Sequence, residues 1–90
     1  MFASCDATSS EATVVLPADL HARPAGKVVQ AAARFDAPVE IAYGDRVANA
    51  RGVLAVMALG ATAGTTVTVR STGPDAGAAV DAVAAVLAEP

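Results

Sequence analysis

The sequence predicts an α+β domain in which helices cover one face of an antiparallel sheet. Segments with strand-like alternation and segments with helical periodicity follow one another in the order β-α-β-β-α-β-α along the 90 residues. The two central strands are separated only by Gly44 and Asp45, a dipeptide typical of a hairpin turn. Because a hairpin pairs its strands antiparallel, the order does not fit a parallel sheet with alternating helices. A chain of this length forms one domain.

The N-terminal third predicts a tail, a strand and a helix. Residues 1–11 are small and polar and predict a flexible tail, which leaves residues 12–90 as the folded domain. Residues 12–17 are a β-branched run closed by proline, as is typical of a strand. Pro38 disfavours helical geometry at the residue before it, so a preceding helix must end there. That helix is predicted over residues 22–35, from apolar side chains at helical spacing: Ala25, Val28, Val29, Ala32 and Phe35.

The rest of the chain predicts three strands and two helices. Residues 39–43 alternate in the strand pattern, and residues 46–49 return after the turn as the other arm of the hairpin. Residues 51–60 predict a short helix that ends at its last glycine. Residues 65–71 alternate again, and residues 75–89 form an apolar helix after a turn.

The composition excludes some classes of function for this protein. Hydrophobic residues make up 54% of the chain and aromatic residues only 3%, so we expect a core of Val, Leu and Ala. The net charge of −3 argues against a general nucleic-acid binder, which needs a basic excess. The one cysteine, Cys5, cannot form an internal disulfide, which suits a reducing cytoplasm. No stretch of about 20 residues is apolar enough to span a bilayer, so we expect no membrane insertion.

The only histidine, His21, precedes Arg23 and Pro24 at the start of a predicted helix. The first N–H groups of a helix lack partners and favour an anion, and the guanidinium of Arg23 matches phosphate oxygens. The sequence therefore indicates that His21 is phosphorylated inside an anion-binding cradle. Capping rules leave two frames open: either Arg23 caps the helix and Pro24 is its first residue, or His21 caps it and Pro24 is third.

Other chemistry at His21 fits less well. A single histidine needs further ligands to hold zinc, and none has suitable spacing here, so we expect no metal and no cofactor. A Ser-His-Asp set cannot be assembled, although Asp19 lies two residues before His21. The alternative that remains open is an exposed or capping histidine with no chemical role.

Two motifs resemble those of the HPr family, the histidine-containing phosphocarriers of the bacterial phosphoenolpyruvate-dependent phosphotransferase system. "LHARPAG", residues 20–26, resembles the family's active-site motif, and "NARGVLAVMALGATAG", residues 49–64, resembles its second signature at the family's spacing. The predicted order of strands and helices is also similar. The resemblance implies an open-faced sandwich, in which a four-stranded antiparallel sheet in the order 1-4-2-3 has three helices on one face.

The resemblance also implies a mechanism. His21 would accept a phosphoryl group on Nδ1 from phosphorylated Enzyme I and pass it to Enzyme IIA domains during sugar uptake. Arg23 would contact the phosphoryl group, and the backbone N–H groups of Ala22 and Arg23 would bind its oxygens. The protein would be a monomeric, cytoplasmic carrier with a covalent phosphohistidine intermediate rather than an enzyme.

A partner surface is implied on the predicted short helix. Val53, Leu54 and Met57 match the family's docking patch, with a polar and basic rim of Lys27, Gln30 and Arg34 on the first helix. The alternative is that the three apolar residues belong to the core. Because a short amphipathic helix has two faces, we expect Leu54 and Met57 to be exposed, with Val56 and Leu59 buried.

Two positions depart from the family pattern. Gly52 occupies the start of the short helix, where many members carry a regulatory serine, so phosphorylation there is not available. Ala18 and Asp19 replace the asparagine and glycine that often stand three and two positions before the histidine. Asp19 would modulate the site: it would repel a phosphohistidine, cap the helix or orient the imidazole ring.

Two other hypotheses about the function remain open. The first is a paralogous carrier of a nitrogen-related or dihydroxyacetone phosphotransfer branch, which shares the same motifs. The second is a small α+β regulatory module that binds a partner and is never phosphorylated.

Overall fold

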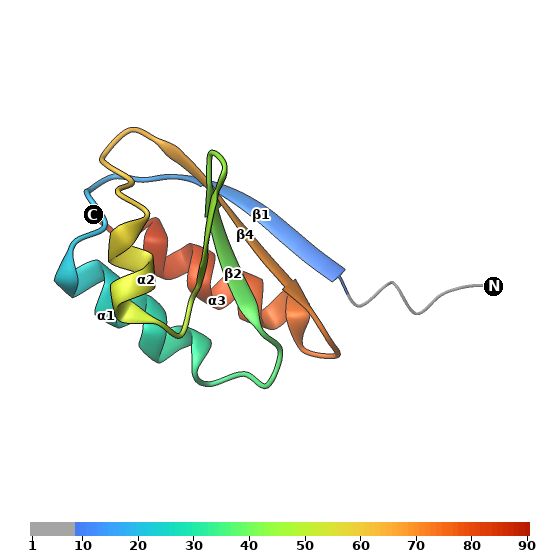
Figure 1. The fold of residues 1–90 in the computed structure, drawn as a ribbon. Coiled ribbons are helices and arrows are strands. Elements are labelled where there is room, and N and C mark those ends of the chain that lie inside the picture. The colour runs from blue at the N-terminus through green and yellow to red at the C-terminus, as the bar shows by residue number, and fades with distance from the viewer. Residues whose placement is uncertain (1–8) are drawn as a thin grey trace.

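The computed structural model describes residues 9–90, and its elements follow the predicted order (Figure 1). The strands are β1 (Ser9–Val15), β2 (Val39–Tyr43), β3 (Arg46–Asn49) and β4 (Thr66–Thr72). The helices are α1 (Ala22–Ala32), α2 (Val53–Ala58) and α3 (Ala76–Leu87). The predicted α+β class is confirmed. None of the helices within residues 9–90 is long and apolar enough to cross a membrane.

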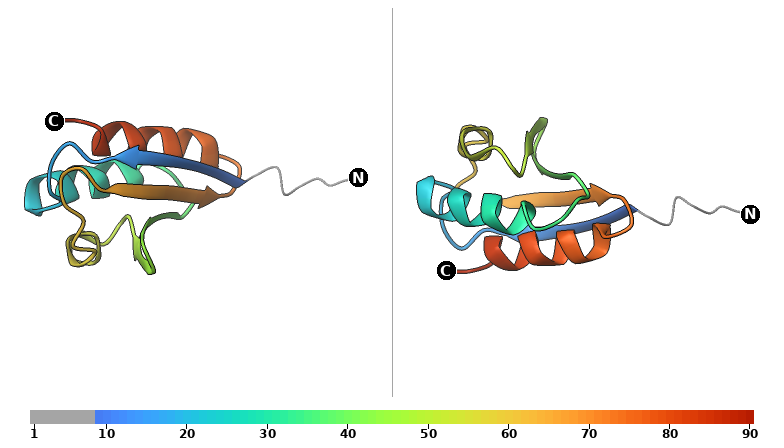
Figure 2. Two further views of the ribbon diagram at one scale, coloured as in Figure 1. Left: turned by 90° about the horizontal axis from the view of Figure 1, so that it is seen from above. Right: turned by 90° about the horizontal axis from the view of Figure 1, so that it is seen from below.

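The four strands form one antiparallel sheet in the order β1-β4-β2-β3, as the resemblance implied. β1 pairs with β4 from Ser9 opposite Thr72 to Val15 opposite Thr66. Buried and exposed residues alternate along β4, since one sheet face lies under the helices and the other faces solvent. Figures 1 and 2 show the C-terminal end of α3 beside the start of α1, although the two are far apart in sequence.

The core consists of aliphatic side chains, as the composition predicted. Strands contribute their inward-facing residues and helices contribute one stripe each, so every element buries an apolar face. The largest side chains with almost no exposure are Leu16, Val28, Val39, Ile41, Val56, Val67, Val69, Val80 and Val83.

The predicted start of the first strand was wrong by three residues. Residues 9–11 belong to β1, where they pair with residues 70–72, and are not part of a tail. Their polar side chains obscured the pattern, because the outer face of an open sheet tolerates Ser and Glu. Residues 1–8 of the predicted tail, with Cys5, lie outside the described residues.

The predicted end of the first helix was also three residues too late. α1 ends at Ala32, and the N–H groups of Arg34 and Phe35 then bond to carbonyls three residues back, as in a tightened last turn. The next two N–H groups, of Asp36 and Ala37, donate to the carboxylate of Asp75 at 3.1 Å each. A side chain distant in sequence thus fixes the chain after α1.

Candidate functional site

His21 is the N-cap residue of α1. Its backbone is extended, with φ −92° and ψ −166°, and its carbonyl accepts the N–H of Ala25 at 3.0 Å. Of the two frames that the sequence left open, His21 is therefore the cap and Pro24 is the third helical residue. Within residues 9–90 the imidazole makes no capping hydrogen bond, and the residue is exposed, so a reactant can reach the ring.

Two N–H groups at this helix start meet no acceptor within residues 9–90. They belong to Ala22 and Arg23, whereas Pro24 has no N–H and Ala25 is already bonded to His21. Because such N–H groups carry the positive end of the helix dipole, they favour an anion beside His21. Their part in binding phosphoryl oxygens stays a prediction.

His21 and Arg23 line one cavity of about 240 Å³, together with Lys27. The opposite wall comes from the end of α3 and the residues that follow it. There the carboxylate of Glu89 forms an ion pair with Lys27, at 3.3 Å. Both charges of this pair are about half exposed, so it adds little to stability. The cavity thus combines one imidazole and one guanidinium without an ion-pair partner within residues 9–90.

The carboxylate of Asp19 lies on the loop after α2, and its effect on His21 stays a prediction. Its Oδ1 accepts the backbone N–H of Ala63 at 2.8 Å, and among residues 9–90 the carboxylate makes no bond that caps α1 and none to the imidazole. The buried Leu20 lies between Asp19 and His21, and its N–H donates to the carbonyl of Ala61 at 3.1 Å. The segment before His21 is therefore fixed to the loop that follows α2.

The α2 helix presents an apolar patch to solvent, defined as Val53, Leu54 and Met57. Their exposed fractions are 39%, 77% and 36%, whereas Val56 and Leu59 are 0% and 2% exposed. The predicted two-faced helix is confirmed, and the alternative that these three residues belong to the core is wrong. Their part in partner binding stays a prediction.

The predicted rim lies on the side of α1 that faces α3. Lys27, Gln30 and Arg34 line a groove of about 520 Å³ with Ala85 of α3 and with Glu89, which follows that helix. The groove that these residues line contains none of the α2 patch residues. The two sets occupy separate places, and a partner would have to extend over α1 to touch both.

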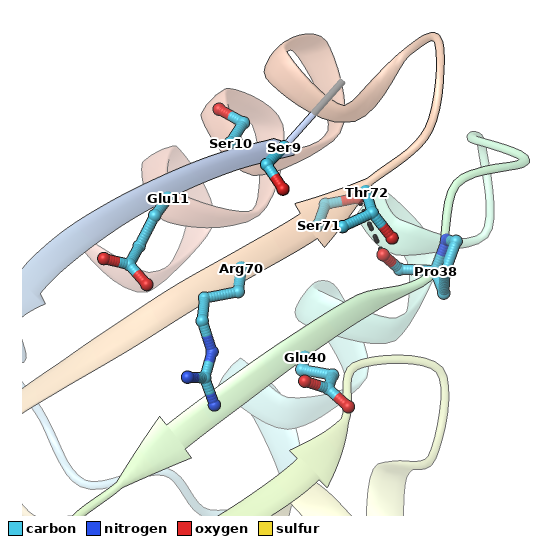
Figure 3. A pocket seen from close by; sticks show the side chains of 8 residues that line it. All are labelled: Ser9, Ser10, Glu11, Pro38, Glu40, Arg70, Ser71 and Thr72. Carbon is cyan, nitrogen blue, oxygen red and sulfur yellow. Dashed lines mark hydrogen bonds between the residues drawn. The ribbon is translucent and has the colours of Figure 1, made fainter. Parts of the chain in front are cut away.

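A larger cavity, of about 610 Å³, lies on the outer face of the sheet (Figure 3). Arg70 of β4 stands there between Glu11 of β1 and Glu40 of β2, which are its direct cross-strand neighbours. This charged row was not predicted from the sequence, although its three residues are exposed positions of three adjacent strands. Within residues 9–90, no group of His, Cys, Asp and Glu could hold a metal ion.

An open-faced α+β sandwich with an exposed histidine at a helix start, beside an arginine, is the arrangement that the resemblance to small phosphocarriers implied. A family model described as "PTS HPr component phosphorylation site" matches residues 8–89. The chain belongs to the HPr family.

Known relatives agree with this assignment. Phosphocarrier protein HPr of Cupriavidus necator is 36% identical over 78 residues, which cover 87% of this chain and 88% of the relative. A multiphosphoryl transfer protein of Xanthomonas campestris is 36% identical over 77 residues, which cover 86% of this chain but 9% of that protein. The crystal structure of an HPr from Bacillus anthracis has a TM-score of 0.80 and 33% identity, covering 88% of this chain and 96% of that one.

Proposed function

We propose that this protein carries a phosphoryl group on Nδ1 of His21. It takes the group from phosphorylated Enzyme I and passes it to Enzyme IIA domains in sugar uptake. The observation that supports the proposal most strongly is the shared cavity of His21 and Arg23 at the N-terminus of α1, with two unbonded N–H groups beside it. Family membership supports the carrier role, and Enzyme I and IIA follow from the resemblance.

The chemistry is a simple displacement. The lone pair of Nδ1 attacks the phosphorus, a P–N bond forms at His21, and the bond from phosphorus to the donor breaks with its electron pair returning to the donor. The proton on Nε2 stays in place. The guanidinium of Arg23 and the N–H groups of Ala22 and Arg23 bind the phosphoryl oxygens, which carry charge throughout the transfer. The second transfer reverses these steps toward the IIA acceptor.

The α2 patch suits the docking role. An exposed leucine, valine and methionine give an apolar centre, and aliphatic patches of this kind mark contact surfaces. Arg34 adds a positive charge on α1 beside the Lys27–Glu89 ion pair, which complements an acidic partner. A small contact surface suits the transient complexes of a carrier, so we propose that the protein is a monomer. We also propose that it acts in the cytoplasm, as the resemblance implies.

The proposal is tested by incubating the protein with phosphoenolpyruvate and Enzyme I. We expect a mass gain of one phosphate that is labile in acid and stable in base, and its loss in His21→Ala. A wild-type protein without the gain, or a variant that keeps it, would contradict the carrier role and favour a binding module. Transfer onward to IIA domains of different branches separates sugar uptake from the nitrogen-related and dihydroxyacetone alternatives.

A further inference from the structure

The segment that leads to His21 is joined to the loop after α2 by four hydrogen bonds among the described residues. Three use backbone groups only: Leu16 N–H to Thr65 O at 2.9 Å, Gly64 N–H to Leu16 O at 2.7 Å, and Leu20 N–H to Ala61 O at 3.1 Å. The fourth is the 2.8 Å bond from Ala63 N–H to the carboxylate of Asp19. It is the bond nearest to His21 that a single side-chain substitution removes.

This bond connects the two functional elements. The accepting side chain stands two residues before His21, and the donating N–H stands five residues after α2 ends at Ala58. Ala61 is 3% exposed, so the loop is anchored in the core where it meets Leu20. Asp19 therefore links the loop that follows α2 to the segment that leads to His21, the proposed phosphoryl acceptor.

The bond also controls where a negative charge lies. A carboxylate two residues from His21 would repel a phosphoryl group if it turned toward the ring. A charged acceptor on a backbone N–H makes a comparatively strong hydrogen bond. Binding to Ala63 thus holds the Asp19 charge on the loop and away from the cavity that His21 and Arg23 share.

We propose that Asp19 is a positioning residue for phosphoryl transfer, which holds the backbone before His21 in place by its bond to the Ala63 N–H. The inference rests on the proposed function of His21. It assigns the carboxylate a geometric role, in which the acceptor oxygen matters more than the charge.

The test compares Asp19→Ala with Asp19→Asn, because asparagine keeps an acceptor oxygen and loses the charge. The rate of phosphoryl transfer from Enzyme I is measured at increasing carrier concentration. We expect Asp19→Ala to lower the maximal rate about tenfold, since small misplacements of reacting groups are costly, with little change in KM. Asp19→Asn should stay close to the wild-type rate. Asp81→Ala, an exposed site on α3, controls for loss of one charge.

Two results would overturn the proposal. Equal slowing in Asp19→Ala and Asp19→Asn would mean that the charge acts and the bond does not. A wild-type rate in Asp19→Ala would mean that Asp19 positions nothing. Slowing confined to Asp19→Ala, with a preserved KM, supports it.

A second readout separates this inference from the proposed function. The ring resonances of His21 and the exchange rate of the Ala63 amide are measured in the unphosphorylated protein. We expect both to change in Asp19→Ala and to be preserved in Asp19→Asn; no change in either variant contradicts the proposal. If wild type gains no phosphate, the carrier role fails while these measurements still decide whether Asp19 places His21.

Discussion

At the scale of single residues, the site depends on where α1 begins. His21 occupies the cap position without using its side chain as a cap, although Ser, Thr, Asp and Asn are the residues that usually cap through their side chains. The helix start therefore keeps its unbonded N–H groups available for a ligand. A serine cap would stabilise this helix end more, but it would occupy an N–H group that our proposal assigns to the phosphoryl oxygens.

Arg23 is predicted to act through its forked guanidinium. Arg23→Ala should slow phosphoryl gain from Enzyme I about tenfold or more, because one fixed donor to developing charge has a large effect on rate. The rate of Arg23→Lys should fall between those of wild type and Arg23→Ala, since lysine keeps the charge and loses the bidentate geometry. Arg70→Ala, on the outer face of the sheet, removes the same charge from a residue that does not line the His21 cavity and serves as the control. An unchanged rate in Arg23→Ala would contradict the assigned contact.

At the scale of elements, α2 combines an exposed apolar patch with a start that has no side-chain cap. Gly52 is its N-cap residue, with φ −106° and ψ 104° and no side-chain hydrogen bond. At the other end, the guanidinium of Arg46 donates to the carbonyls of Ala58 and Leu59 at 3.4 and 3.5 Å. The helix has 6 residues, too short to be stable alone, so its ends and its buried Val56 hold it in place.

Gly52→Ser is predicted to fold and to stabilise the protein. A Cβ at this position would meet Ala55 Cβ at 3.4 Å and Asn49 O at 3.6 Å, which are ordinary contacts, and the negative φ suits any residue. A serine cap and a less flexible unfolded chain should raise the free energy of unfolding by about 0.5–1 kcal/mol. Urea unfolding of Gly52→Ser, with Gly52→Ala as the variant without a hydroxyl, measures this. A serine variant less stable than wild type would refute it.

At the scale of the whole molecule, side chains far apart in sequence close the fold. Asp75, at the start of α3, accepts the N–H groups of Asp36 and Ala37, and Ala37 is 4% exposed. The charged row of Glu11, Arg70 and Glu40 crosses three strands on the outer face. The bonds of Asp75 tie the start of α3 to the segment between α1 and β2.

Asp75→Ala is predicted to destabilise the protein by about 1–3 kcal/mol, because it leaves two N–H groups without acceptors, one of them buried. Asp75→Asn, which keeps one acceptor oxygen, should lose less. Urea unfolding compares both with Asp81→Ala, an exposed helix position that should change stability by less than about 0.5 kcal/mol. If Asp75→Ala were as stable as wild type, the contact would not hold the loop.

The sequence predicted the fold more completely than it predicted the contacts around the site. Periodicity and turn chemistry gave every element in order, and the spacing of Val56 and Leu59 against Leu54 and Met57 gave both faces of α2. The start of β1 was missed because polar side chains on an open sheet face carry no burial signal. The bonds of Asp19 and Asp75 were beyond prediction, since each joins residues about 40 positions apart. Capping rules alone could not choose between His21 and Arg23.

The central claim is that His21 receives the phosphoryl group on Nδ1. Nitrogen-15 NMR of the imidazole, recorded after incubation with phosphoenolpyruvate and Enzyme I, tests it most directly. The account predicts phosphorus coupling to Nδ1 of His21 in the phosphorylated protein. An unmodified His21 ring, or a phosphate on another residue, would contradict it.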